Sequence, residues 1–523
     1  MAGAFNVSGD DSGGSKDVGS PVIFDAVKKP KRNKYAFGCA ILASMTSVLL
    51  GYDIGVMSGA AIYIKDQLHV SDVKLEIVVG IINFFSLVGS ALAGRTSDWI
   101  GRRYTMVLAG AIFFVGAILM GFATNYSFLM FGRFVAGIRS RLCPHDCSGV
   151  HGRGFFSIIS WISYFIPGSF INIGVLLGYV SNYAFSKLPA NLGWRFMLGI
   201  GAIPSIGLAI GVLGMPESPR WLVMKGRLGE ARQVLDKTSD SKEESRLRLS
   251  DIKQAAGIPE ECNDDIVVMP KRRNDEAVWK ELLLHPTPSV RHAFIAGVGL
   301  HFFQQSSGID AGGLYSPRIF EKAGITSTDL KLLATIAVGI SKTLFILVAT
   351  FLLDRIGRRP LLLTSMGGMI ISLTLLGTSL AVIATQITQF IGPGHWQSSE
   401  VYHTWAVFFW LGPIAWGYSS EVFPLRLRAQ GCSIGVAVNR GTSGIISMTF
   451  LSLYKAISIA GAFYLFAAIA GVAWIFIFTL LPETQGRSLE EMGLLFGTYF
   501  GWRKTLKGLK NREAEEAKNA NVI

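Results

Sequence analysis

The stretch Ser47-Val-Leu-Leu-Gly51-Tyr52-Asp53-Ile-Gly55-Val-Met-Ser-Gly59-Ala-Ala-Ile places one acidic residue in the middle of an apolar run. With its N-terminal flank, this run is long enough to cross a bilayer as a helix. A charge at that depth costs about 2.5–3.5 kcal/mol on insertion scales, so Asp53 is expected to have a use. Two uses remain open: a structural ion pair with another helix, or a carboxylate that takes up and releases a proton. The three glycines form a small-residue stripe that predicts close approach of a second helix, which directs Asp53 into a bundle and not into lipid.

The composition is that of a polytopic membrane protein. Half of the 523 residues are apolar and only 16% are charged, whereas soluble domains have about 25% charged residues. The net charge of +13 would suggest nucleic acid as a partner for a soluble protein. Here the basic residues form short clusters between apolar runs, as in cytoplasmic loops, and we expect no nucleic-acid partner. The five cysteines form no even framework, so disulfides are not indicated.

The apolar windows predict an all-α membrane protein with twelve transmembrane helices in two six-helix halves. The windows lie at about 36–62, 76–94, 104–124, 126–142, 155–184, 194–215, 293–316, 331–353, 360–391, 404–423, 432–455 and 459–481. This pattern predicts five regions. They are a disordered cytoplasmic N-terminus (1–35), an N-terminal half (36–215), a cytoplasmic central loop with short helices (216–291), a C-terminal half (292–481) and a cytoplasmic tail (482–523).

The distribution of Lys and Arg predicts the orientation. Basic residues precede the first window and follow the second, eighth and tenth, whereas the loops after windows one and three carry little excess positive charge. By the positive-inside rule, both termini and the central loop are expected on the cytoplasmic side of a multi-pass protein.

An internal repeat relates the two halves. The motif at 94–103, which contains Asp98-Trp-Ile-Gly-Arg-Arg, recurs as Asp354-Arg-Ile-Gly-Arg-Arg, and Pro216-Glu-Ser recurs as Pro482-Glu-Thr. Each motif follows the equivalent window in its half. Repeated halves are typical of transporters in which a central site opens alternately to the two sides of the membrane.

These motifs identify a family resemblance over nearly the whole chain from about residue 22. The sequence resembles the sugar porters of the major facilitator superfamily in the two repeated motifs, in Pro216-Glu-Ser-Pro-Arg220 and in Gln304-Gln-x-x-Gly-Ile309. The stretches at 308–320 and 419–431 resemble those of the plant polyol/monosaccharide transporters in particular. The resemblance implies proton-coupled symport of polyols such as sorbitol, mannitol, xylitol or inositol, and of monosaccharides. It implies a plasma-membrane protein that works as a monomer, without enzymatic activity or a cofactor.

The resemblance also implies roles for individual residues. Asp53 is the expected proton-coupling acid and Arg133 its partner, and a lone arginine inside a membrane needs a counter-ion in any case. Amide side chains suit a polyol, because they donate and accept hydrogen bonds. The residues expected to bind substrate are Asn172, Gln304, Gln305, Asp310, Tyr315, Lys342, Trp416 and Asn439. Asp310 and Lys342 stand where many hexose carriers have neutral residues; either they pair with each other or they bind substrate directly.

The charged motifs at the cytoplasmic ends are expected to act mechanically. Ion pairs between the halves would hold one gate shut in one state and break in the other, each pair alone contributing about 0.2–1 kcal/mol. The residues are Asp98, Arg102, Arg103, Glu217, Arg220, Asp354, Arg358, Arg359, Glu421, Arg428, Glu483 and Arg487.

Two stretches depart from the family pattern. Residues 139–169 lack the expected motif with its glutamate and arginine, and we interpret them as read out of frame through two compensating shifts; residues 392–403 are also atypical. A metal site of Cys143, His145, Cys147 and His151 is an alternative interpretation of the first stretch, but no second cluster completes a zinc module. If the first stretch is genuine, a non-transporting sensor or inactive carrier is an alternative function. A facilitative sugar uniporter is another.

Overall fold

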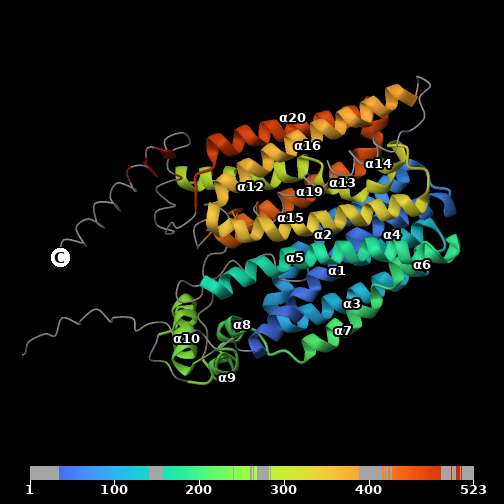
Figure 1. The fold of residues 1–523 in the computed structure, drawn as a ribbon. Coiled ribbons are helices and arrows are strands. Elements are labelled where there is room, and N and C mark those ends of the chain that lie inside the picture. The colour runs from blue at the N-terminus through green and yellow to red at the C-terminus, as the bar shows by residue number, and fades with distance from the viewer. Residues whose placement is uncertain are drawn as a thin grey trace, which may run out of the picture.

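The computed structural model describes residues 34–139, 157–239, 241–259, 286–387 and 427–484, together with short pieces between and after them. The short pieces are residues 262, 264–267, 282, 284, 415–416, 418–419, 422–423, 496, 502–503, 505–506 and 508. Throughout these parts of the chain the regular structure is helical, and no strand occurs among them (Figure 1).

The helices of the first half follow the predicted windows. They are α1 (Lys34–Gln67), α2 (Asp72–Ile100), α3 (Arg102–Gly121), α4 (Tyr126–Arg139), α5 (Ser157–Phe185), α6 (Ala190–Gly199) and α7 (Ala202–Leu213). The sixth window is therefore two short helices, because the chain turns briefly around Ile200 and Gly201.

The second half contains α12 (Pro288–Ser306), α13 (Ile309–Leu314), α14 (Ser316–Lys322), α15 (Thr328–Ile356), α16 (Arg358–Ile387), α19 (Arg428–Ile457) and α20 (Ile459–Leu480). The seventh window is thus a broken helix, whereas the tenth lies mostly outside the described residues. Seven spans in the described part of the chain are long and apolar enough to cross a bilayer, among them those that begin at Lys34, Arg102 and Ile459.

Glycines allow α1 and α5 to pack backbone to backbone, as the stripe in α1 predicts. A Cβ atom added to Gly51 would lie 1.9 Å from the carbonyl oxygen of Ile171, and one added to Gly55 would lie 2.3 Å from that of Val175. The approach is reciprocal, since a Cβ on Gly174 would lie 2.1 Å from the carbonyl oxygen of Val48. The expected close helix–helix contact is therefore present.

The two halves share the turn that the repeated motif encodes. Gly101 joins α2 to α3 with φ = 94°, and Gly357 joins α15 to α16 with φ = 100°. Both values lie in the region that favours glycine, because other residues have a clashing Cβ there. The internal repeat inferred from sequence is therefore a repeat of backbone geometry as well.

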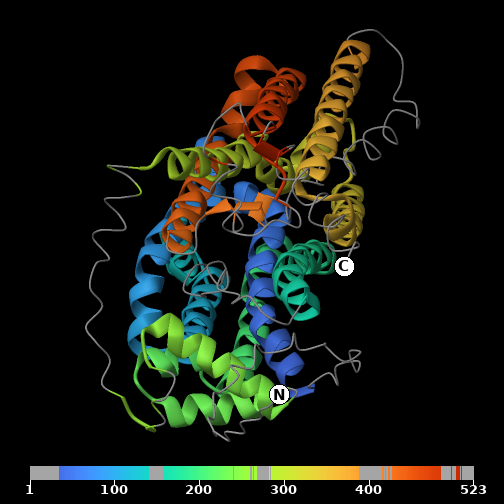
Figure 2. The same ribbon diagram turned by 90° about the vertical axis from the view of Figure 1, so that its left-hand side faces the viewer.

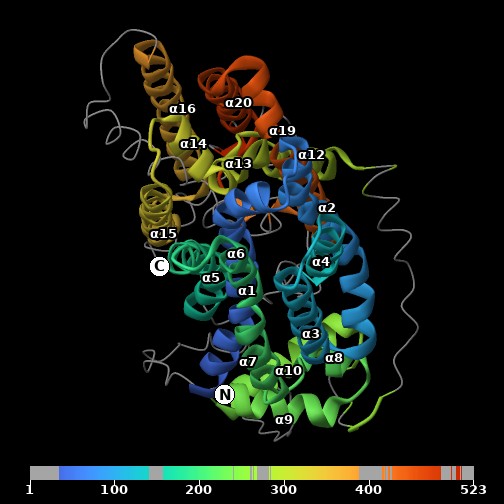
Figure 3. The same ribbon diagram turned by 90° about the vertical axis from the view of Figure 1, so that its right-hand side faces the viewer.

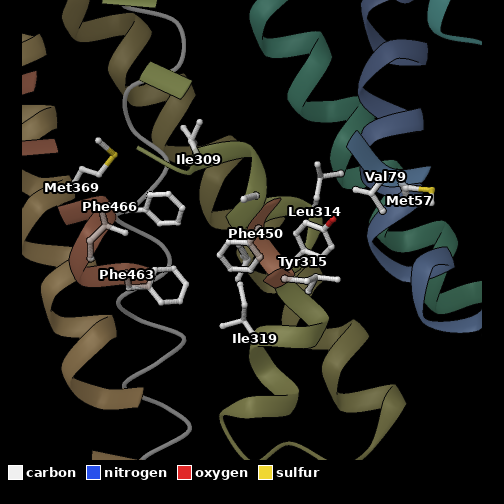
Figure 4. Packing of buried hydrophobic residues seen from close by; sticks show 14 of the residues in the cluster. Met57, Val79, Ile309, Leu314, Tyr315, Ile319, Met369, Phe450, Phe463 and Phe466 are labelled. Atoms are coloured by element: carbon white, nitrogen blue, oxygen red, sulfur yellow. The ribbon is translucent and has the colours of Figure 1, made fainter. Parts of the chain in front are cut away.

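In the described part of the chain, the halves meet mainly along two helix pairs and, at the centre, through α1. α2 packs against α19, α5 packs against α15, and α1 contacts α13. Figure 3 shows α5 beside α15 at one edge of the boundary between the halves, and α2 at the other edge. The apolar core continues across this boundary: Met57 and Val79 of the first half lie near Leu314 and Tyr315 of the second half (Figure 4).

Three helices of the central loop form a separate small unit. These are α8 (Pro219–Met224), α9 (Leu228–Thr238) and α10 (Lys242–Ala256), which lie together at one end of the bundle near the start of α1 (Figures 1 and 2). They have their own apolar cluster, which includes Leu222, Val223, Leu235 and Leu249. This end is called the loop-helix end below, and the opposite end is called the far end.

Candidate functional site

Asp53 and Arg133 form a buried ion pair between α1 and α4. One Nη atom of Arg133 donates to both carboxylate oxygens of Asp53, at 3.2 and 3.3 Å. The side chains are only 1% and 6% exposed. The Nε of Arg133 has no hydrogen-bond partner among the described residues. The two charges therefore depend largely on each other, and a proton on Asp53 would remove most of that attraction.

Three amide side chains form a connected group between α12 and α19. Asn439 donates to the Oε1 of Gln304 at 3.1 Å and accepts from the Nε2 of Gln305 at 3.2 Å. All three are buried, and the Oε1 of Gln305 has no hydrogen-bond partner among the described residues. An unpaired buried acceptor is costly, so this atom is ready to accept a bond from a hydroxyl group.

A break in the seventh window places Asp310 next to this group. Gly308 has φ = 79° and separates α12 from α13, which begins at Ile309. Asp310 follows immediately and accepts a short hydrogen bond from the Oγ of Ser443 on α19. A Cβ on Gly308 would lie 2.7 Å from the ring of Phe466, so the backbone and the packing both require glycine here.

Asp310 belongs to a charged cluster that spans three elements. Its carboxylate attracts Lys342 of α15 and Arg440 of α19, both of which are half-buried. Asp310 and Lys342 are therefore within electrostatic reach of each other, and both alternatives, mutual pairing and direct contact with substrate, stay predictions. Arg440 was missed, although a lone cation inside the apolar window 432–455 is the same signal that singled out Arg133.

The other expected substrate residues differ in their surroundings. Tyr315 is 1% exposed, donates to the carbonyl oxygen of Ser447 at 2.8 Å and stacks on Phe450, so it belongs to the core. The ring of Trp416 meets the ring of His301 edge to face, with centroids 4.9 Å apart. Asn172 is half-buried and donates to the carbonyl oxygen of Gly168, one turn earlier in α5.

The motif glutamates at the loop-helix end cap helices within their own halves. Glu217 accepts from the backbone N–H groups of Arg102 and Arg103, and Glu483 does the same for Arg358 and Arg359. The second arginine of each motif donates to a carbonyl oxygen near the end of α7 or α20 in its own half. A carboxylate at a helix N-terminus is favourable because the free N–H groups carry partial positive charge. These contacts lie within each half, and the ion pairs expected between the halves stay a prediction.

The remaining expected gate residues are described only in part. Asp98 is exposed, and its backbone carbonyl accepts from the indole of Trp221. Burial in the loop-helix unit lowers the pKa of Arg220, and the nearby Arg102 adds repulsion. Arg428 donates to the carbonyl oxygen of Phe423. Glu421, Arg487 and the side chain of Asp354 lie outside the described residues, as do the Cys143–His151 cluster and residues 392–403.

Paired, repeated bundles with buried charges and amides between their helices define a membrane transporter of the major facilitator fold. The model of the family described as "Sugar (and other) transporter" matches residues 39–496, and the chain belongs to this family. It is 59% identical over 504 residues to polyol transporter 5 of Arabidopsis thaliana, covering 95% of this chain and 92% of the relative. It is 58% identical over 511 residues to putative polyol transporter 1 of the same species, covering 95% and 99%.

Solved structures agree with the fold. The proton:xylose symporter XylE bound to 6-bromo-6-deoxy-D-glucose has a TM-score of 0.70 and 24% identity, and the match covers 89% of this chain and 100% of that one. The inward-open xylose transporter XylE from E. coli also gives a TM-score of 0.70 with 24% identity, over 88% and 100%. The expected all-α major facilitator fold is confirmed.

Proposed function

We propose that this chain carries linear polyols and monosaccharides across a membrane together with protons, by alternating access. The observation that carries the proposal is the buried ion pair of Asp53 and Arg133, because protonation of Asp53 changes the charge of the interior in a single step. The relatives named polyol transporters and the fold shared with a protein titled a proton:xylose symporter support the same function.

The amide group and the charged cluster supply the chemistry for the substrate. The free Oε1 of Gln305 and the amides of Gln304 and Asn439 offer acceptors and donors for a row of hydroxyls. Asp310 has anionic oxygens that accept from hydroxyls more strongly than a neutral amide does. This combination favours polyols and a broad range of sugars over strict hexose selectivity.

We place the loop-helix end and both termini in the cytoplasm and the protein in the plasma membrane, as a monomer with two six-helix halves. The basic pairs at 102–103 and 358–359 support this orientation, since they lie on the side that carries α8–α10.

The test is uptake of labelled sorbitol in a transporter-deficient cell at acid and neutral external pH. Symport through Asp53 predicts uptake that is stimulated by acid, abolished by a protonophore and lost in Asp53→Asn. Asp66→Asn is the matched control, because Asp66 lies near the end of the same helix and is exposed. Uptake that does not change with external pH and is not reduced by the protonophore would identify a uniporter. No uptake despite insertion at the cell surface would favour an inactive carrier and would direct attention to residues 139–169.

A further inference from the structure

Polar contacts join the two halves at the far end. Asp72 at the start of α2 pairs with Lys455 near the end of α19, and also with Lys65 of α1. On the other edge of the boundary, Lys187 after α5 pairs with Asp329 at the start of α15, with 2.6 Å between Nζ and Oδ2. Both of these contacts are partly or largely exposed, so water and salt weaken them.

Glu76 makes a different kind of contact, one turn deeper in α2. It is only 1% exposed, and its two carboxylate oxygens accept from one residue of the other half: Oε1 from the backbone N–H of Ser452 at 2.8 Å, and Oε2 from its Oγ at 2.7 Å. Lys455 attracts the same carboxylate from the end of α19. Hydrogen bonds to a charged acceptor are roughly twice as strong as neutral ones, and they strengthen further where water is excluded.

This contact continues into the candidate site. Two turns deeper, Asn83 of α2 donates to the Oγ of Ser443 on α19 at 3.2 Å, and Ser443 in turn donates to Asp310. Small residues let the two helices approach along this line: a Cβ on Gly80 would lie 2.3 Å from the side chain of Met448. Asp72, Glu76 and Asn83 therefore occupy one face of α2, bonded to one face of α19.

We propose that Glu76 is a positioning residue that latches the far ends of the two halves together, and that the line from Glu76 through Asn83 and Ser443 couples this closure to Asp310. The carboxylate is satisfied by Ser452 when the halves are closed and by water when they are apart. At an intermediate separation, neither Ser452 nor water satisfies the carboxylate. Glu76 therefore favours the closed and the open state over a partly open one. The proposal deepens the proposed transport function, because it assigns a residue to the closing of one side of the alternating-access cycle.

The test measures exposure of a buried position between the halves. Val79 is 1% exposed and lies in the same apolar cluster as Leu314 and Tyr315 of the other half, so a Val79→Cys thiol is expected to react with a maleimide only when the far end opens (Figure 4). The full-length chain is purified in detergent, where the reagent reaches both ends, and the same chain with Val79 retained gives the background from the native cysteines.

Glu76→Ala removes both bonds to Ser452 and is expected to raise the labelling rate of Val79→Cys about tenfold or more. Glu76→Gln keeps one acceptor and is expected to raise the labelling rate by a smaller factor. Ser452→Ala, which removes only the Oγ donor, is expected to raise it a few-fold and serves if Glu76→Ala does not fold. Glu321→Ala is the matched control, because Glu321 forms its ion pairs with Arg318 and Lys331 in its own half. Equal labelling rates in the Glu76, Ser452 and control variants would overturn the proposal. The labelling rate is measured without transport. Its result therefore tests the role of Glu76 independently of the proposed substrate and proton coupling.

Discussion

Substitution of Gly55 by alanine tests the close contact of α1 and α5. The added Cβ would lie 2.3 Å from the carbonyl oxygen of Val175 and 2.9 Å from its Cα. These are backbone atoms that cannot rotate out of the way, so the two helices must separate. Gly38 lies in the same helix, and a Cβ there meets nothing within 4 Å, which makes Gly38→Ala the matched control.

The expected magnitude follows from two opposing terms. Replacing a mid-helix glycine by alanine stabilises by about 0.5–1 kcal/mol at either position, since alanine loses less backbone entropy on folding. Overpacking a tight contact costs about 1–3 kcal/mol. The first term cancels between the two variants, so Gly55→Ala is expected to be less stable than Gly38→Ala by about 1–3 kcal/mol.

Thermal unfolding of the detergent-purified chains, followed by the loss of the monodisperse size-exclusion peak, measures this difference. We expect Gly38→Ala to melt at or slightly above the parent temperature and Gly55→Ala to melt below it. Gly59→Ala should be milder than Gly55→Ala, because its Cβ meets the side chain of Asn182, which can move. If Gly55→Ala melted at or above Gly38→Ala, the backbone contact between α1 and α5 would be wrong.

The same melting assay checks three further predictions. Asp53→Asn should destabilise more than Arg133→Gln, within the range of about 3–5 kcal/mol for a broken buried pair, because arginine stays charged whereas a lone carboxyl becomes neutral by taking up a proton. The double variant should melt above Asp53→Asn, and additive losses would show that the residues do not interact. Glu217→Ala should cost about 1–2 kcal/mol through the lost cap of α3, with Glu217→Gln closer to the parent, and equal losses in both variants would exclude a role for its acceptor oxygens. Asp329 raises the pKa of the exposed Lys187, so their attraction is present at neutral pH and disappears only as the pH rises through that raised pKa; Lys187→Ala should change the melting temperature little at physiological salt, and a large drop would contradict an exposed pair.

Sequence reasoning predicted the parts of this structure that depend on local pattern. Apolar windows located the helices, and the glycine stripe of α1 located a helix contact, because both signals are periodic along one segment. The partners of Asp53 and Gln304 required knowledge of which distant segments face each other. The family resemblance supplied Arg133 and Asn439, which the structure brings beside them.

Residues outside the family motifs were missed for a physical reason. Glu76, Asn83, Ser443 and Arg440 acquire their contacts only when α2, α13, α15 and α19 come together. The charge of Arg440 inside an apolar window was a usable signal, whereas a serine such as Ser443 bonds its own helix in many proteins and indicates nothing by itself. The backbone contacts of Glu217 and Glu483 were not foreseen, because a motif reveals which charges are present and not which backbone groups lie in reach.

The break at Gly308 has a consequence for how motion in this protein can be observed. α13 and α14 have six and seven residues, and helices this short are marginal unless neighbouring elements hold them. Their neighbours include α1 of the opposite half, α15 and α19. Amide hydrogen exchange in residues 309–322 should therefore accelerate whenever the halves part at this position, even while the long helices remain protected. The segment therefore reports this motion through deuterium taken up from the solvent, with no attached probe and no substituted residue.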